Sequence, residues 1–408
     1  MRAFRAQHPS GRVRNPLATL ATLAMAGLAA LCAVQTQAAT WQALLVTATD
    51  DPRHTRLRHE KAYPGHPSGP VRPALDVALE ESQMNLESSG HQLRLDALEW
   101  DGASASALVT DINRKAPHYL VLDMPLAQQQ ALMAQFSALK TKPVVFNVAE
   151  GADVLRGSAC HPNWLHTAPS QRMLADAWAQ WLSSRGWRDV LWLVGPSPAD
   201  KALREVWAAA IKRHGLKAKA ERGFVLSGDP RQREQGNPRL LTAEPGHDAV
   251  LVLDTDGEFA RTLPYATALP RPVVGSSGLV PLAWHPQWDR YGAPQLNRRF
   301  AKQAKRPMTG HDWAAWVAIK SIVTVLEDQP KATLPQQLAA LRSGQVTVDG
   351  FKGGTVSFRA WDGQLRQPIF LAHGDGVAVQ TPIEGAMHPR DVLDTLGTDE
   401  RESTCKAR

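Results

Sequence analysis

The sequence has few cysteines and only one long apolar run. Three cysteines occur among its 408 residues, and the first, Cys32, lies inside that run. The run covers residues 17–34, and no other apolar segment approaches the length that crosses a bilayer. This absence excludes a membrane protein with several spans.

Motifs of common catalytic sites are also missing. No serine lies in a Gly-x-Ser-x-Gly elbow, and the segment 275–278 (GSSG) lacks the lysine of a phosphate-binding loop. Cys160 precedes His161, but neighbouring residues rarely face each other, so this pair does not indicate a nucleophile with its base. We expect no catalytic residues, no cofactor and no enzyme; a hydrolase would need a nucleophile that the sequence does not show.

The N-terminal segment is typical of a secretory signal peptide. Four arginines precede the apolar run, and Thr36-Gln37-Ala38 places small residues at the positions that signal peptidase reads. We expect residues 1–38 to be removed on export to the periplasm. The alternative is a membrane anchor, which is disfavoured because no basic stop-transfer cluster follows.

The remaining chain is close to electrically balanced. Loss of the four N-terminal arginines lowers the net charge from +7 to +3, which is 42 basic against 39 acidic side chains. Nothing in this balance indicates a nucleic-acid partner. We expect a monomer that is not inserted in the membrane.

Two cysteines remain after export, Cys160 and Cys405. In an exported protein they are a plausible disulfide, and two buried free thiols are the alternative.

The apolar pattern predicts alternating strands and helices, and therefore parallel sheets flanked by helices. The clearest stretch is residues 168–226. A helix after Ser170 precedes the buried strand 190–194. Ser197-Pro198 then begins a second helix that runs to about Arg213 and leads into a strand at 216–226. The other predicted strands are 41–49, 93–98, 119–122, 144–146, 249–253 and 272–274, and the other helices are 73–86, 103–114, 126–139, 293–305, 312–327 and 334–341. Residues 350–380 differ, with short strands and Asp-Gly turns at Asp362 and Asp375.

Polar residues follow the predicted strands where they end. In parallel sheets these ends meet at one edge, so a small polar solute would bind there. Helix caps and turns favour the same residue types, and that reading stays open. The candidate ligand-binding residues are Asp123, Asn147, Ser197, Asp254, Asp256, Ser276 and Ser277.

Two acidic or histidine-rich segments could hold a metal. Residues 254–258 (DTDGE) match part of a calcium loop, but the remaining ligands and the final Glu are absent. A second group, Asp50, Asp51, His54, His59, Glu60 and His66, has no recognised ligand spacing. We therefore predict no metal site.

Several motifs resemble those of the type I periplasmic solute-binding proteins, the leucine/isoleucine/valine-binding group of ABC importers. They are residues 63–71 (YPGHPSGPV), 165–170 (LHTAPS) and 350–358 (GFKGGTVSF). The third motif is followed by Asp362-Gly363. Narrower matches are similar to the subfamily associated with alcohol oxidation dependent on pyrroloquinoline quinone. They comprise residues 254–259, 263–265, 270–275, 283–285, 291–296, 306–308 and 312–316.

The resemblance implies two α/β lobes, 39–166 plus 287–352 and 167–286 plus 353–382, with crossings near Thr167, Pro286 and Gly353 and a tail at 383–408. It implies a substrate-binding component that works with permease and ATPase subunits. Amino-acid binders of the group carry Ser/Thr-rich loops where this chain has residues 123–125 (DMP) and 147–150 (NVAE), so an amino-acid ligand is in doubt. The alternative is a periplasmic sensor or carrier that delivers a cofactor or metal to a dehydrogenase.

Overall fold

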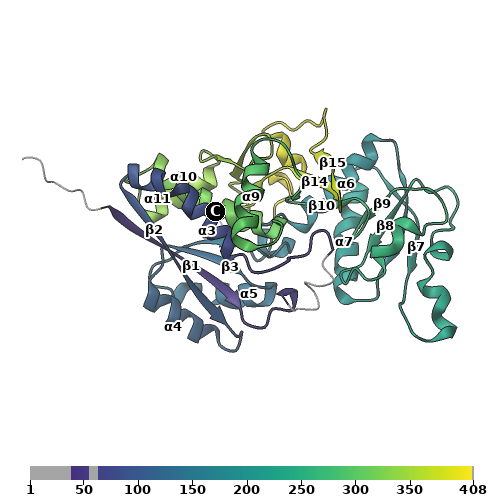
Figure 1. Cartoon of the computed structure of the whole chain (residues 1–408), viewed down its shortest axis with the longest axis horizontal. Coiled ribbons are helices and arrows are strands. Elements are labelled where there is room, and N and C mark those ends of the chain that lie inside the picture. Colours follow the sequence, from purple (N-terminus) through teal and green to yellow (C-terminus); the bar gives the residue numbers. More distant parts are fainter. Residues whose placement is uncertain (1–37, 55–62, 407–408) are drawn as a thin grey trace, which may run out of the picture. The chain divides into compact units, whose positions relative to one another are not determined.

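The first sheet has five strands in the order β2-β1-β3-β4-β5 (Figure 1). The computed structural model describes residues 38–54 and 63–406, so the predicted signal peptide lies outside the described residues apart from Ala38. β1, β3, β4 and β5 pair in parallel, and every residue of β3 is buried. The bounds are β1 Ala39–Ala48, β2 His91–Trp100, β3 Tyr119–Asp123, β4 Val144–Asn147 and β5 Trp164–His166.

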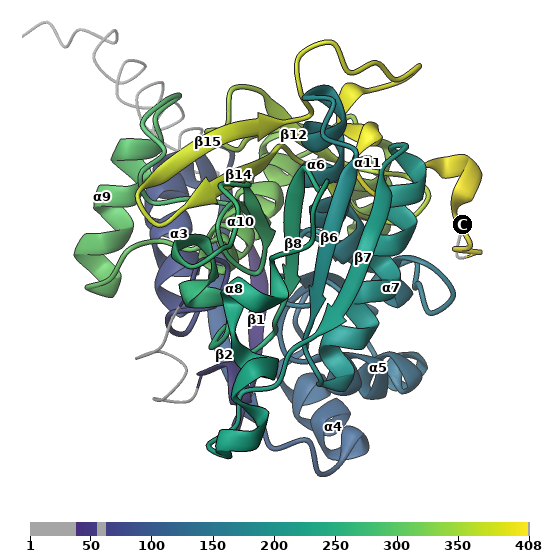
Figure 2. The same cartoon turned by 90° about the vertical axis from the view of Figure 1, so that its right-hand side faces the viewer.

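The second sheet has four strands in the order β7-β6-β8-β9, all paired in parallel (β9 is labelled in Figure 1, and β6, β7 and β8 in Figure 2). Their bounds are β6 Asp189–Val194, β7 Lys217–Gly223, β8 Ala249–Leu253 and β9 Val273–Gly275. The central strands β6 and β8 are almost wholly buried, because both faces of the sheet are covered. Helices α6 (Gln171–Ser184) and α7 (Pro198–Arg213) pack on one face, and Phe259, Ala260 and Leu263 pack on the other. The predicted α/β class with parallel sheets is therefore confirmed.

Two small antiparallel sheets complete the strands that the structure describes. One contains β10 Val280–Leu282, β14 Ile369–His373 and β15 Gly376–Thr381, and the other contains β11 Val348–Asp349, β12 Thr355–Phe358 and β13 Leu365–Arg366. The tight connection from β14 to β15 contains Asp375, where the sequence predicts a turn.

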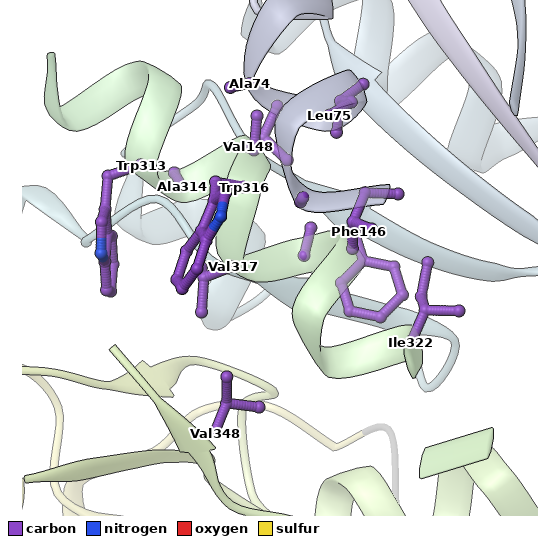
Figure 3. Packing of buried hydrophobic residues seen from close by; sticks show 14 of the residues in the cluster. Ala74, Leu75, Phe146, Val148, Trp313, Ala314, Trp316, Val317, Ile322 and Val348 are labelled. Atoms are coloured by element: carbon purple, nitrogen blue, oxygen red, sulfur yellow. The ribbon is translucent and has the colours of Figure 1, made fainter. Parts of the chain in front are cut away.

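The helices and the strands both contribute to the apolar core. α3 packs against α9 and α10, and α10 is buried on most of its surface, including Trp313 and Trp316 (Figure 3). The helix bounds are α3 Arg72–Ser88, α4 Ala105–Lys115, α5 Leu126–Ala134, α6 Gln171–Ser184, α7 Pro198–Arg213, α8 Pro238–Leu241, α9 Ala293–Ala304, α10 Gly310–Asp328 and α11 Leu334–Ser343. Among the described residues, none of these helices has both the length and the apolarity to span a bilayer.

The C-terminal tail is fixed to the rest of the chain. Cys160 and Cys405 form a disulfide with a Cα–Cα distance of 5.6 Å, as the sequence predicts. The tail contains two short 3-10 helices, Val392–Thr395 and Glu400–Glu402, and it contacts the core in addition to being held by this bond. Asp394 is fully buried and accepts a hydrogen bond from Arg359 Nε at 2.8 Å, and Leu396 packs in the core.

Four short strands escaped prediction. β5 lies within residues 148–168, where the sequence pattern shows no strand, and β10, β11 and β13 are only two or three residues long. The predicted strand at 216–226 ends early, at Gly223. Trp284 and Trp288 are both buried, and their ring N–H groups donate to Asn297 and to the Phe351 carbonyl.

Candidate functional site

A cluster of charged and imidazole side chains surrounds Asp123 at the end of β3. Arg53 Nη2 and His311 Nε2 each lie 3.0 Å from Asp123 Oδ1, and His54 Nε2 lies 3.7 Å from Oδ2. Arg53 and His54 belong to the short 3-10 helix Pro52–His54 after β1, whereas His311 is in the first turn of α10. Only 2% of the Asp123 side chain is exposed, so its charge is balanced by these neighbours rather than by water.

Asp51 is the second carboxylate of this cluster. It accepts from Arg53 Nε at 2.9 and 3.0 Å and also pairs with Arg53 Nη2, in a bidentate arrangement. Asp51 is buried as well. The guanidinium of Arg53 thus joins two buried carboxylates that come from the ends of β1 and β3.

The surroundings keep both carboxylates ionised. Burial acts to raise the pKa of Asp123, but the neighbouring His311, His54 and Arg53 outweigh it and hold the pKa well below its ordinary value. Burial likewise opposes ionisation of Asp51, and the hydrogen bonds and charge of Arg53 lower its pKa overall.

His311 is positioned by the start of α10. Thr309 caps this helix, because its side chain accepts from the Asp312 N–H while the Asp312 carboxylate accepts from the Thr309 N–H at 2.9 Å. Arg306 Nη1 in turn lies 2.7 Å from Asp312 Oδ2. Gly310 brings this turn close to Ala283, where an added Cβ would lie 3.1 Å from the Ala283 Cβ.

A cavity of about 180 Å³ adjoins the cluster. Arg53, Gln171 and His311 are its lining residues with polar side chains, and the rest of the described lining is small or apolar. That remainder comprises Gly65, Pro67, Val148, Ala149, Gly151, Ala168, Pro169, Leu174, Pro281, Leu282, Ala283 and Gly310. Such a lining can enclose a small solute and orient it by a few polar contacts.

Asn147, the predicted site residue at the end of β4, shapes one wall of this cavity. Its Oδ1 accepts from the backbone N–H groups of Ala149 and Glu150, at 3.2 and 2.8 Å, and its Nδ2 donates to the Glu150 carbonyl at 2.7 Å. Asn147 is fully buried. It therefore holds the loop whose residues line the cavity but does not line the cavity itself.

The predicted residues of the second sheet hold local structure. Ser197 caps α7 and exchanges hydrogen bonds with Asp200, Asp254 Oδ2 accepts from the Ala260 N–H at 2.9 Å, and Ser276 Oγ accepts from the Asp254 N–H at 2.9 Å. Asp256 and Ser277 lie in the loops after β8 and β9. None of the seven predicted ligand-binding residues is among the described residues that line the cavity.

The loop after β8 contacts a segment far away in the sequence, at Tyr63. The Tyr63 hydroxyl donates to the Thr255 carbonyl at 2.5 Å, and Gly257, at φ +72°, lies so close to the Tyr63 ring that an added Cβ would lie 2.7 Å from it. A larger residue at 257 would therefore meet both backbone strain and a clash.

Sequence reasoning missed Arg53, Gly310 and His311 as site residues. Arg53 lies shortly after the first strand. The rule that selects polar residues at strand ends, which gave Asp123, therefore also applies to Arg53. His311 had a weaker signal, its place after the Thr309 cap at a helix start. His54 was weighed only within the histidine-rich group, whose members His59 and Glu60 lie outside the described residues.

No family model matches this sequence, and no curated protein matches it. Solved structures do match. A branched-chain amino acid ABC transporter ligand-binding protein from Burkholderia xenovorans matches with a TM-score of 0.66 at 10% identity, over 90% of this chain and 99% of that chain. A periplasmic binding protein from Burkholderia mallei matches with a TM-score of 0.61 at 13% identity, over 91% of this chain and 99% of that chain. A solute-binding protein from R. palustris, in complex with benzoate, matches with a TM-score of 0.59 at 12% identity, over 90% of this chain and 99% of that chain. The chain therefore has the α/β fold of periplasmic binding proteins, with parallel sheets flanked by helices.

Proposed function

We propose that this chain is the substrate-binding component of an ABC importer and that it acts in the periplasm after removal of residues 1–38. It binds a small polar solute, catalyses no reaction and presents the solute to permease and ATPase subunits. The observation that carries this proposal is the cavity of about 180 Å³, in which Arg53 and His311 meet an otherwise small or apolar lining.

The proposed solute is compact and offers the cavity an oxygen-rich polar group. Arg53 and Gln171 supply N–H donors, and the small lining residues leave room for an apolar body. One structural neighbour holds benzoate, a carboxylate on an apolar ring, which fits the same description.

The two lobes and their roles are part of the proposal. Residues 39–166 plus 287–352 would form one lobe, residues 167–286 plus 353–382 the other, and residues 383–408 the tail. Binding of the solute between the lobes would favour the closed form and shift the population towards it. In this proposal Asp123 acts at the cavity through Arg53 and His311, and Asn147 shapes a loop that lines it. Ser197, Asp254, Asp256, Ser276 and Ser277 would belong to the facing lobe.

The proposal also includes a physiological setting, namely a system for alcohol oxidation dependent on pyrroloquinoline quinone. It is included because residues 254–259 and 312–316 resemble motifs of the subfamily associated with such systems. The second candidate function is a periplasmic carrier of a cofactor or metal. It is favoured by the closeness of two histidines to Asp123.

Mass spectrometry of small molecules released from the purified native protein tests the proposal, followed by calorimetry with the molecule found. Ala149→Trp fills the cavity and should weaken binding at least tenfold, whereas Ala301→Trp, at an exposed position on α9, should leave the affinity unchanged. Scattering should show contraction when the solute is added. Equal affinities of the two variants would contradict a solute site in this cavity.

A further inference from the structure

We propose that His54, Asp123 and His311 form a binding site for one divalent transition-metal ion, of the class of Zn²⁺ or Co²⁺. The proposal rests on the geometry of these three residues and stands independently of the importer function. Two imidazoles and one carboxylate are a ligand set that transition metals favour, and imidazole disfavours Ca²⁺ and Mg²⁺.

The ligand atoms are already close to the spacing that a metal requires. All three lie within 4.8 Å of one another. Ligands at about 2.0–2.1 Å from a tetrahedral ion are separated by roughly 3.3 Å. The distances from Asp123 to His311 Nε2, 3.0 Å, and to His54 Nε2, 3.7 Å, fall on either side of this value. Small side-chain rotations would therefore complete the site.

His311 gives independent support. Its side chain is only 8% exposed, and its Nε2 lies 3.0 Å from Asp123 Oδ1, close enough for an ion pair when the imidazole is protonated but without the alignment of a hydrogen bond. A buried polar atom without a hydrogen bond costs free energy, so such atoms usually have a purpose or a missing partner. A metal ion beside Asp123 would supply that partner.

Arg53 is the main competitor for Asp123, and its geometry is compatible with a metal. Arg53 Nη2 contacts Oδ1, whereas the other oxygen, Oδ2, is the one nearest His54. The positive charge of Arg53 is offset by its bidentate pairing with Asp51. The carboxylates of Asp51 and Asp123 carry two negative charges and the guanidinium of Arg53 one positive charge. When the imidazoles are neutral, the cluster therefore has a net charge of −1, and this charge favours binding of a cation.

The cavity gives the bound ion an accessible side. His311 and Arg53 both line it, so a metal held by three protein ligands would direct its remaining coordination position towards a space of about 180 Å³. Three protein ligands with one open position are typical of sites that bind an exchangeable small ligand. A small oxygen donor could therefore bind to the ion from the cavity.

Equilibrium dialysis and visible absorption with Co²⁺ and Zn²⁺ test the site. The full-length sequence is expressed, and the exported protein is purified without an affinity tag and freed of metal with a chelator. We expect one ion per chain with micromolar affinity and the visible bands of nitrogen-coordinated Co²⁺. His311→Ala should weaken binding at least tenfold, whereas His388→Ala, in the tail beside Asp399, should not change it.

A second variant separates loss of a ligand from loss of the fold. His54→Gln changes a side chain that is 21% exposed, and thermal unfolding of the metal-free variants reports their stability. Loss of the Co²⁺ bands in folded His54→Gln would support the site even if His311→Ala were unstable. Unchanged affinity in both variants, or no binding tighter than millimolar by the unmodified protein, would overturn the proposal.

Discussion

The aspartates at the ends of β3 and β8 occupy similar places in two parallel sheets but have different partners. Asp123 contacts Arg53, His54 and His311, three side chains from two distant segments. Asp254 accepts from the backbone N–H of Ala260, six residues further along its own chain. One carboxylate thus joins distant parts of the fold, and the other holds its own loop.

The residues that follow each strand explain this difference. After β8, the Asp254 carboxylate accepts from the N–H of Ala260, the first residue of the short 3-10 helix Ala260–Tyr265. After β6, Ser197 likewise caps α7 with its side chain, so both side chains serve the element that follows their strand. After β3, the N-cap of α5 is Pro125, which has no side-chain cap, and the Asp123 carboxylate is directed to other segments. A polar strand end is therefore a better candidate for binding when the next helix does not use it as a cap.

Replacing the two aspartates should give the largest contrast. Asp123→Ala leaves Arg53 with one carboxylate fewer in a buried site and should lower the free energy of unfolding by about 3–5 kcal/mol. Asp254→Ala removes a hydrogen bond to backbone and should cost about 1–2 kcal/mol. Urea unfolding of both variants measures the difference, and equal losses would refute the distinction between the two sites.

Ser197→Ala should have a smaller effect, a loss of about 1 kcal/mol in unfolding free energy, because it removes only a helix cap. Co²⁺ affinity should stay the same, since Ser197 contacts neither the cavity lining nor the Asp123 cluster among the described contacts. Weaker Co²⁺ binding in this variant would place Ser197 in the site after all.

The smallest expected effect is a pH dependence at Asp254. Burial is the largest influence on this carboxyl and raises its pKa above the ordinary 3.8. Between these two pKa values the folded chain binds more protons than the unfolded chain, so stability falls as pH rises through that window. Asp254→Asn should remove this slope, which is less than about 1.4 kcal/mol per pH unit for one proton.

Urea unfolding at several pH values from 3.5 to 7, compared between wild type and Asp254→Asn, measures this slope. Asn keeps a side-chain acceptor for the Ala260 N–H, so the cap is preserved as a control. A slope that persists unchanged in the variant would show that another group causes it.

The layered fold could be predicted because its strands and helices are marked locally. The continuous apolar run 190–194 and the Ser197-Pro198 cap place β6 and α7 almost to the residue. β5, β10, β11 and β13 could not be predicted, because two or three residues show no period and pairing with distant strands decides their form.

The candidate site could be predicted only in part. Asp123 follows a strand and was found by that rule, but the approach of His311 depends on packing between elements almost two hundred residues apart. The sequence likewise gives no signal for the metal site proposed above, because the spacing of His54, Asp123 and His311 in the sequence matches no ligand motif. Local patterns therefore identify individual candidates, and only the tertiary structure brings them together.

The disulfide makes the chain from Cys160 to Cys405 a covalent ring, with a sequence separation of 245 residues. The exposed segment Pro230–Gly236 lies within that ring. A protease that cuts there opens the ring but releases no fragment, so the two pieces stay together in a denaturing gel until a reductant is added. Arg53, which precedes the ring, and His311, which lies inside it, would then remain parts of one covalent molecule after cleavage.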